Sequence, residues 1–111
     1  MRRRALAGEP ARGVASSLVI AVSGELDIYT APLLRDCFRD LALGVDVAID
    51  AAGISFLDST GIGVLVGAAK RLRDTGNHLV VRHAQSQTRK VLDVAGVLRV
   101  IRLENPAEGV S

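Results

Sequence analysis

The chain has 111 residues and a mass of 11.7 kDa, which is the size of one domain and is enough to bury a core without disulfides or metal. Hydrophobic residues make up 49% of it and charged residues 23%, as in ordinary globular proteins, whereas aromatic residues are only 3%. The core is therefore expected to consist of Val, Leu, Ile and Ala. The scarcity of aromatic rings argues against a surface that stacks nucleic-acid bases.

The net charge of +2 is concentrated at the N-terminus. The first thirteen residues carry four arginines against one glutamate, while the other 98 carry ten basic and eleven acidic groups. We therefore expect a basic, flexible tail over residues 1–13, with room for an edge strand near Val14, and a single domain over residues 14–104. Residues 105–111 are expected to form a short polar tail.

The chain has features of a protein from a reducing compartment. Cys37 is the only cysteine, so neither an internal disulfide nor a cysteine-rich metal cluster can form. It falls on the apolar stripe of a predicted helix, which favours a buried thiol. No apolar run reaches the roughly 18 residues of a membrane span, and no signal peptide is recognisable. We expect a cytoplasmic protein without a membrane partner.

The first half of the domain predicts a strand followed by a helix. Residues 17–23 are apolar and rich in β-branched side chains, which is typical of a strand, and residues 24–27 predict a turn. Thr30 is suited to cap a helix, and Pro32 fits its first turn. Apolar residues then recur at helical spacing until Gly44, where the helix is expected to end.

The middle of the chain predicts a second strand, helix and third strand. Residues 45–50 alternate in polarity, which predicts a strand, and residues 51–57 are expected to form a turn. A helix is expected to begin at Ser59 and to stop near Gly76. Residues 78–83 predict the next strand.

The end of the chain completes an alternating order of strands and helices. Ser86 is predicted to cap a third helix that ends at Gly96, and residues 98–103 predict a last strand. Strands separated by helices are typical of one α/β domain in which helices cover a largely parallel sheet.

Most enzyme chemistries find no support in the sequence. His78 and His83 are the only histidines, and their odd spacing on one strand would place them on opposite faces, which does not suit a shared metal. Residues 61–67 are rich in glycine, but they match neither the dinucleotide fingerprint nor a Walker A loop. We expect no metal and no cofactor.

The segment Asp58-Ser59-Thr60-Gly61 opens the second helix and has two interpretations. It is not an aspartic-protease half-site, and Ser59 lacks both the flanking glycines of a nucleophile elbow and a histidine base. The hydroxyl or the carboxylate could simply cap the helix. Alternatively, Ser59 is a phosphoacceptor, whose phosphate the helix dipole and free backbone N–H groups would accommodate while a docked partner would not.

Three blocks of the sequence, in order, resemble the STAS domain family, and within it the bacterial anti-anti-sigma factors, or anti-sigma factor antagonists. They are Gly24-Glu25-Leu26-Asp27, Ser55 to Gly63 (SFLDSTGIG), and Arg89-Lys90-Val91-Leu92 with Ala95-Gly96-Val97. The similarity extends from about Leu18 to Leu103. It implies a single STAS-like domain with a mixed, mostly parallel sheet of 4–5 strands and 3–4 helices mainly on one face.

The resemblance also implies a non-enzymatic switch between partners. In its unphosphorylated form such a protein binds an anti-sigma factor, a serine kinase of the histidine-kinase-like ATPase type, and thereby releases a sigma factor. The kinase phosphorylates the serine that is Ser59 here, with Thr60 as second choice, and a PP2C-type phosphatase reverses this. Direct binding to nucleic acid is not implied, and a homodimer is left open. The expected partner-binding positions are Gly24, Glu25, Asp27, Asp58, Ser59, Thr60, Gly61, Gly63, Lys70, Arg71 and Asp74.

Two rival functions remain open. Other STAS proteins are scaffold subunits of large signalling assemblies or accessory modules of lipid transport, and this chain could serve in the same way. A small hydrolase that uses Ser59 is the other alternative. The chain also departs from the family pattern, because only residues 105–111 remain where the family commonly has a further helix, and the arginine-rich start leaves the usual first strand in doubt.

Overall fold

A computed structural model describes residues 2–4, 17–40 and 44–104 of the chain. Within them, one sheet has the strand order β1-β2-β3-β4-β5. The strands are β1 (Arg2–Arg4), β2 (Ser17–Leu26), β3 (Asp46–Leu57), β4 (Leu79–Arg82) and β5 (Arg102–Glu104), and the helices are α1 (Ala31–Asp40), α2 (Ser59–Asp74) and α3 (Ser86–Val94). β1 pairs antiparallel with β2, and the other neighbours are parallel.

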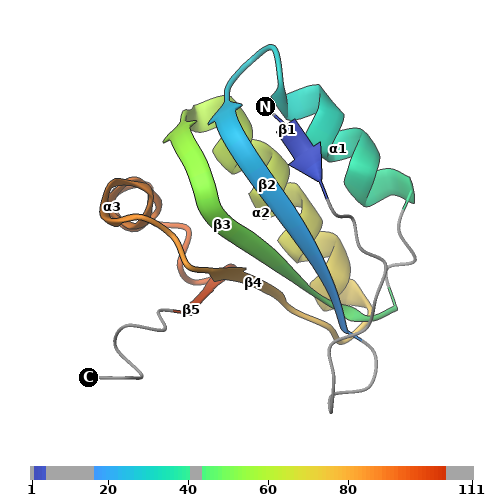
Figure 1. The fold of residues 1–111 in the computed structure, drawn as a ribbon. Helices are drawn as coiled ribbons and strands as arrows, with labels where there is room; N and C mark the ends of the chain where they lie inside the picture. Colours follow the sequence, from blue (N-terminus) through green and yellow to red (C-terminus); the bar gives the residue numbers. More distant parts are fainter. Residues whose placement is uncertain (1, 5–16, 41–43, 105–111) are drawn as a thin grey trace.

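The topology explains why α1 and α2 share one face of the sheet (Figure 1). Each parallel strand lies next to its predecessor in the chain, so successive crossovers move across the sheet in one direction. Crossovers of one hand then put their helices on one side. The predicted α/β class, with a mixed and mostly parallel sheet, is confirmed.

The core between the sheet and these helices is aliphatic, as the composition predicts. Ile20, Leu34, Ile49, Leu65 and Leu72 have at most 2% of their surface exposed. They come from β2, α1, β3 and α2 in turn, so every layer contributes to one cluster. Cys37 is buried in the same cluster, as expected, with 5% exposed.

β2 and β3 are both longer than the sequence pattern predicts. The predicted turn at residues 24–27 is wrong up to Leu26, and the predicted turn at residues 51–57 is wrong throughout, because the two strands remain paired to Leu26 and Leu57. Two register shifts, between Ala21 and Ser23 and between Gly24 and Glu25, place extra residues in β3, so its residues 51–57 do not show the alternating burial of an even strand. Gly24 has a φ of +91°, which suits glycine at such an irregularity.

Two predictions near the C-terminal half are also wrong in detail. Ser86 is the first helical residue of α3 rather than its cap; Gln85 occupies the cap position without a capping side chain. The last strand is only Arg102–Glu104, because Val100 and Ile101 donate backbone hydrogen bonds to the Val97 carbonyl and form a helical turn instead.

The arginine-rich start contributes backbone to the sheet. Arg2–Arg4 form β1 along the outer edge of β2, where a flexible tail was expected. Strand pairing uses main-chain groups, so an arginine sequence can supply it at an exposed edge. The strand expected near Val14 lies outside the described residues, as do residues 105–111 and the predicted helix end between Asp40 and Gly44. The domain limits of 14–104 stay a prediction.

Candidate site at the β3–α2 junction

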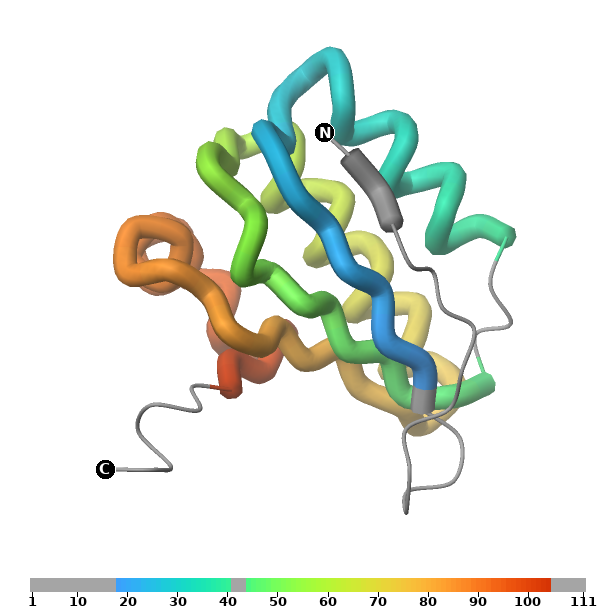
Figure 2. The backbone as a smooth tube through the Cα atoms, in the orientation of Figure 1, coloured from blue at the N-terminus to red at the C-terminus, as the bar shows by residue number. Residues whose placement is uncertain are grey.

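The β2–α1 turn and the β3–α2 junction meet at the same end of the sheet (Figure 2). The backbone N–H of Asp58 donates a hydrogen bond of 3.2 Å to the carbonyl oxygen of Leu26, the last residue of β2. This bond joins the two segments in which the sequence places most of the candidate residues. The topology requires their proximity, since both segments follow neighbouring parallel strands.

Asp58 is the residue that caps α2. Its Oδ1 accepts hydrogen bonds from the backbone N–H groups of Thr60, at 2.9 Å, and Gly61, at 3.1 Å, and its own backbone is extended. Two of the unpaired N–H groups at the start of a helix are thereby satisfied. Of the two groups that the sequence left open as caps, the structure selects the carboxylate.

Ser59 is consequently exposed at the first position of α2. Its side chain stands at the helix N-terminus without serving as the cap. The expectation that a phosphate here would use free backbone N–H groups is wrong for Thr60 and Gly61, because Asp58 already occupies both. Thr60 is half-buried and lines a hollow between α1 and α2 together with Arg35 and Phe38, so Ser59 is the more accessible hydroxyl.

Gly61 allows the helix to begin tightly against the sheet. A Cβ at this position would lie 2.9 Å from the carbonyl oxygen of Leu26 and 2.9 Å from Cδ1 of Leu57. A backbone oxygen cannot move aside cheaply, so this position requires glycine. By contrast, an added Cβ at Gly63 would have no neighbour within 4 Å, and nothing inside the fold explains that glycine.

Asp27 organises the neighbouring turn. Its Oδ1 accepts hydrogen bonds from the backbone N–H groups of Tyr29, at 2.9 Å, and Thr30, at 3.0 Å. Desolvation favours the neutral acid, but these bonds and the Thr30 hydroxyl outweigh it and lower the pKa of Asp27 below its ordinary value. The oxygen of the Thr30 hydroxyl lies 2.7 Å from the carbonyl oxygen of Glu25 and 3.1 Å from Oδ1 of Asp27, so its single proton is shared between these two acceptors. The carboxylate therefore shapes the loop beside Ser59.

The remaining candidates on α2 divide into two sets. Lys70 and Asp74 follow Ser59 by eleven and fifteen residues, which at 3.6 residues per turn returns them to the same exposed side of the helix as Gly63. This α2 stripe of Ser59, Gly63, Lys70 and Asp74 is about 22 Å long at 1.5 Å per residue. Arg71 is also exposed but lies nearer α1, where it lines the hollow together with Gly63 and Gly67.

A set of exposed apolar side chains around this end of the sheet was not predicted from the sequence. Ile28 is 61% exposed, Tyr29 84% and Phe56 47%. Two apolar residues directly after the Gly24–Asp27 block were a signal for the first pair. No such signal pointed to Phe56, because residues 51–57 were expected to form a turn.

Neither histidine can serve Ser59 as a base. β4 pairs with residues 47–50 of β3, so His83 lies beside the middle of β3, and Leu57 is about 20 Å farther along at 3.3 Å per residue. His78 precedes β4 and is farther still. The described part of the chain also has no cluster of three His, Cys, Asp or Glu side chains arranged to hold a metal. Within residues 2–4, 17–40 and 44–104, no helix combines the length and apolar character that a membrane span requires.

Comparison with known proteins identifies the family. The model of the STAS domain matches residues 10–108. The chain is 32% identical over 95 residues to the anti-sigma-B factor antagonist of Bacillus subtilis, covering 85% of this chain and 87% of that protein. It is 34% identical over 88 residues to the anti-sigma-B factor antagonist of Listeria monocytogenes, covering 78% and 77%.

Solved structures agree on the fold. The anti-sigma factor antagonist SpoIIAA in its unphosphorylated form superposes with a TM-score of 0.66 at 20% identity over 92% of this chain and 91% of that one. The phosphorylated form of Bacillus SpoIIAA gives a TM-score of 0.63 at 21% identity, covering 92% and 95%. The fold and site define a STAS domain of the kind found in bacterial regulators. This chain belongs to the STAS domain family.

Proposed function

We propose that this protein is an anti-sigma factor antagonist that binds an anti-sigma factor when Ser59 is unmodified and releases it when Ser59 is phosphorylated. Two relatives at 32% and 34% identity, each matched over more than three quarters of its length, bear the name anti-sigma-B factor antagonist. Binding the anti-sigma factor frees a sigma factor for transcription, which would place the protein in the cytoplasm.

The single observation that supports the switch is that Asp58, and not Ser59, caps α2. Asp58 holds the helix start, so Ser59 is exposed and can be modified without removing a structural contact. A phosphate adds between one and a half and two negative charges beside the Asp58 carboxylate. The fold keeps its cap, while a partner docked over this point would have to desolvate adjacent like charges.

The α2 stripe and the Asp27 turn form the proposed docking surface. The stripe runs from Ser59 to Asp74 on the exposed side of α2, and the turn adds Glu25 and the exposed ring of Tyr29. Gly63 keeps the middle of the stripe flat, since its Cα carries no side chain and faces open space. A partner backbone can approach closely there.

In this proposal the partners catalyse both the addition and the removal of the phosphate. The anti-sigma factor is a serine kinase of the histidine-kinase-like ATPase type and supplies ATP, and a PP2C-type phosphatase restores the unmodified form. The protein itself works without catalysis, metal or cofactor. Its role is to present a hydroxyl and a surface that discriminate between the two states.

Paired affinity capture from a lysate of the source organism tests the proposal. The baits are Ser59→Ala and Ser59→Glu, with Arg99→Glu as a control for a change of surface charge, because Arg99 is exposed in the connection between α3 and β5. We expect an ATPase-type anti-sigma factor with the Ser59→Ala and Arg99→Glu baits and none with Ser59→Glu. Identical partners on both Ser59 baits would make Ser59 an ordinary surface residue and favour a scaffold or transport-accessory role.

A further inference from the structure

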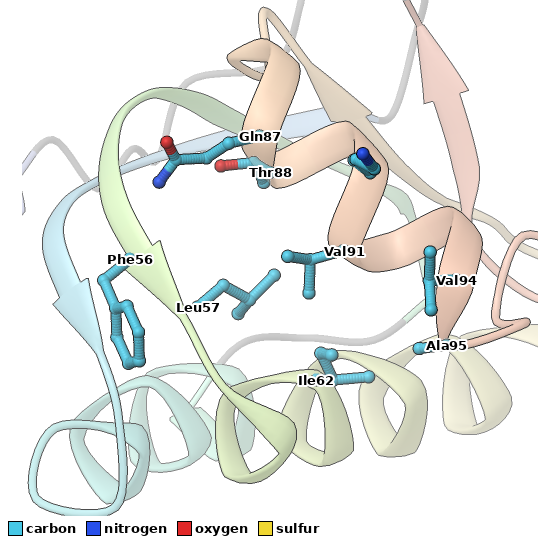
Figure 3. A pocket seen from close by; sticks show the side chains of 9 residues that line it. Phe56, Leu57, Ile62, Gln87, Thr88, Val91, Val94 and Ala95 are labelled. Atoms are coloured by element: carbon cyan, nitrogen blue, oxygen red, sulfur yellow. The ribbon is translucent and has the colours of Figure 1, made fainter.

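An apolar groove lies directly beside the candidate phosphoacceptor. Figure 3 shows Phe56 and Leu57 from β3, Ile62 from α2, and Val91 and Val94 from α3 around one hollow. Its volume is about 570 Å³. Phe56 and Ile62 are each three residues from Ser59 along the chain, so the groove and the hydroxyl share the β3–α2 segment.

The fold creates this groove because β4 is short. β4 pairs only with residues 47–50, so the second half of β3 has no strand on that side. Two glutamine side chains of the α3 segment bond this free edge instead: Nε2 of Gln85 donates to the carbonyl oxygen of Ala52 at 2.8 Å, and Nε2 of Gln87 donates to that of Ser55 at 3.3 Å. α3 is thereby fixed at a distance that leaves the apolar walls apart.

The walls are open to solvent rather than closed around a small ligand. Val94 of α3 is 78% exposed, although the same helix buries Thr88 and Leu92 almost completely. Phe56 of β3 is 47% exposed. A site for a small molecule normally encloses most of its ligand. An open groove with an exposed aromatic residue at its edge is typical of a surface that receives a side chain from a protein partner.

The charge on the groove restricts the chemistry of that partner. Lys90 is exposed and lines the groove, and it is the only charged residue among the lining side chains. A partner segment that places an apolar side chain in this groove would therefore gain from a neighbouring carboxylate that pairs with Lys90. A second copy of this chain would instead bring one Lys90 toward another in a symmetric contact.

We propose that this groove is a second docking point for the anti-sigma factor, which inserts an apolar side chain flanked by an acidic residue. The inference rests on the function proposed above, because the groove continues the surface around Ser59. A partner anchored in the groove would hold its backbone over the hydroxyl. Phosphorylation would then act at the edge of a contact that excludes water.

The test measures the affinity of the purified, captured anti-sigma factor for the full-length protein by isothermal titration calorimetry. Val94→Gln replaces an apolar side chain of the groove by a polar one that is compatible with a helix, and Lys90→Glu reverses the charge of the cation that lines the groove. The matched controls are Leu98→Gln, an exposed apolar residue outside the groove lining, and Arg73→Glu, an exposed cation near the end of α2. We expect each groove variant to weaken binding at least about tenfold and each control less than about twofold.

The outcomes separate this inference from the proposed function. If Ser59→Glu abolishes binding while Val94→Gln and Lys90→Glu bind as the parent protein does, the groove is not a docking point and the switch stands. If no purified anti-sigma factor binds the parent protein, both proposals fail. Two further measurements test other occupants of the groove: sedimentation tests a second copy of this chain, and the fluorescent probe anilinonaphthalene sulfonate tests residues 105–111. If Val94→Gln dissociates a dimer without changing the affinity for the partner, a second copy occupies the groove and the inference is wrong. If the probe binds only after residues 105–111 are removed, those residues occupy the groove and the inference is again wrong.

Discussion

Replacing Asp58 and Ser59 separately distinguishes a structural role from a switching role at adjacent positions. Asp58→Ala removes the acceptor for the backbone N–H groups of Thr60 and Gly61, which lie 2.9 and 3.1 Å from its Oδ1. Loss of such a cap costs about 1 kcal/mol, within a range of roughly 0.5–2 kcal/mol. Ser59→Ala removes an exposed hydroxyl that caps nothing, and we expect a change below about 0.5 kcal/mol.

Urea denaturation followed by circular dichroism measures this difference. With a urea dependence of about 2 kcal/mol per molar, Asp58→Ala should lower the midpoint by about 0.5 M, and Ser59→Ala should leave it nearly unchanged. Asp58→Asn is the matched control, since its amide oxygen can still accept the two backbone hydrogen bonds. The urea midpoint of Asp58→Asn should lie between those of Asp58→Ala and Ser59→Ala.

The opposite ranking would refute the assignment of the cap. If Ser59→Ala destabilises the protein by 1 kcal/mol or more while Asp58→Ala is neutral, the hydroxyl holds the helix start. Ser59 would then be a structural residue, and its phosphorylation would act on folding rather than on binding alone.

Three further predictions concern the same end of the molecule. Gly61→Ala should destabilise the fold by about 1–3 kcal/mol in urea denaturation, because its Cβ would lie 2.9 Å from the Leu26 carbonyl oxygen; a neutral effect would contradict the close contact. Gly63→Ala should raise stability by about 1 kcal/mol, since its Cβ meets nothing within 4 Å, and should weaken partner binding; unchanged affinity would exclude Gly63 from the docking surface. Because the pKa of Asp27 is lowered, its carboxylate stabilises the fold above the ordinary value of 3.8, and this contribution is lost as pH falls through the folded value. The stability difference between the parent protein and Asp27→Asn should therefore shrink at acid pH; a constant difference from pH 7 to pH 2 would contradict it.

The elements that follow from local patterns could be predicted from the sequence. The helical spacing of Leu34, Cys37 and Phe38 identified the buried side of α1, and all three are in the core. Residues 59–76 were expected to form a helix that ends near Gly76, and α2 with its following turn agrees. Such features depend on neighbours three or four residues apart, which a single sequence displays directly.

Features that depend on contacts between distant segments could not be predicted in the same way. The pairing of β3 to Leu57 depends on two register shifts at which β3 has an extra residue opposite β2, and neither strand alone reveals it. The groove depends on Gln85 and Gln87 bonding the free edge of β3 more than thirty residues earlier. The choice between Asp58 and Ser59 as the cap was left open because both residue types cap helices well, and only the side-chain geometry decides between them.

The candidate surface on α2 was predicted in part. Helical periodicity places Gly63, Lys70 and Asp74 on the side of Ser59, and all four are exposed. Arg71 is exposed as well, and it also lines the hollow between α1 and α2. The exposed apolar side chains Tyr29 and Phe56 were not foreseen, because burial is the usual fate of large apolar residues and their exposure follows from the loop and strand end that carry them.

The most direct test of the account is the affinity of the purified anti-sigma factor for this protein with phosphoserine at position 59 compared with the unmodified protein. Leaving like charges desolvated in an interface costs about 2–5 kcal/mol, so phosphorylation should weaken binding by about 30-fold or more. The urea midpoints of the two forms should remain close, since Asp58 still caps α2. Affinities that agree within about threefold would show that the exposed hydroxyl of Ser59 does not control the partner.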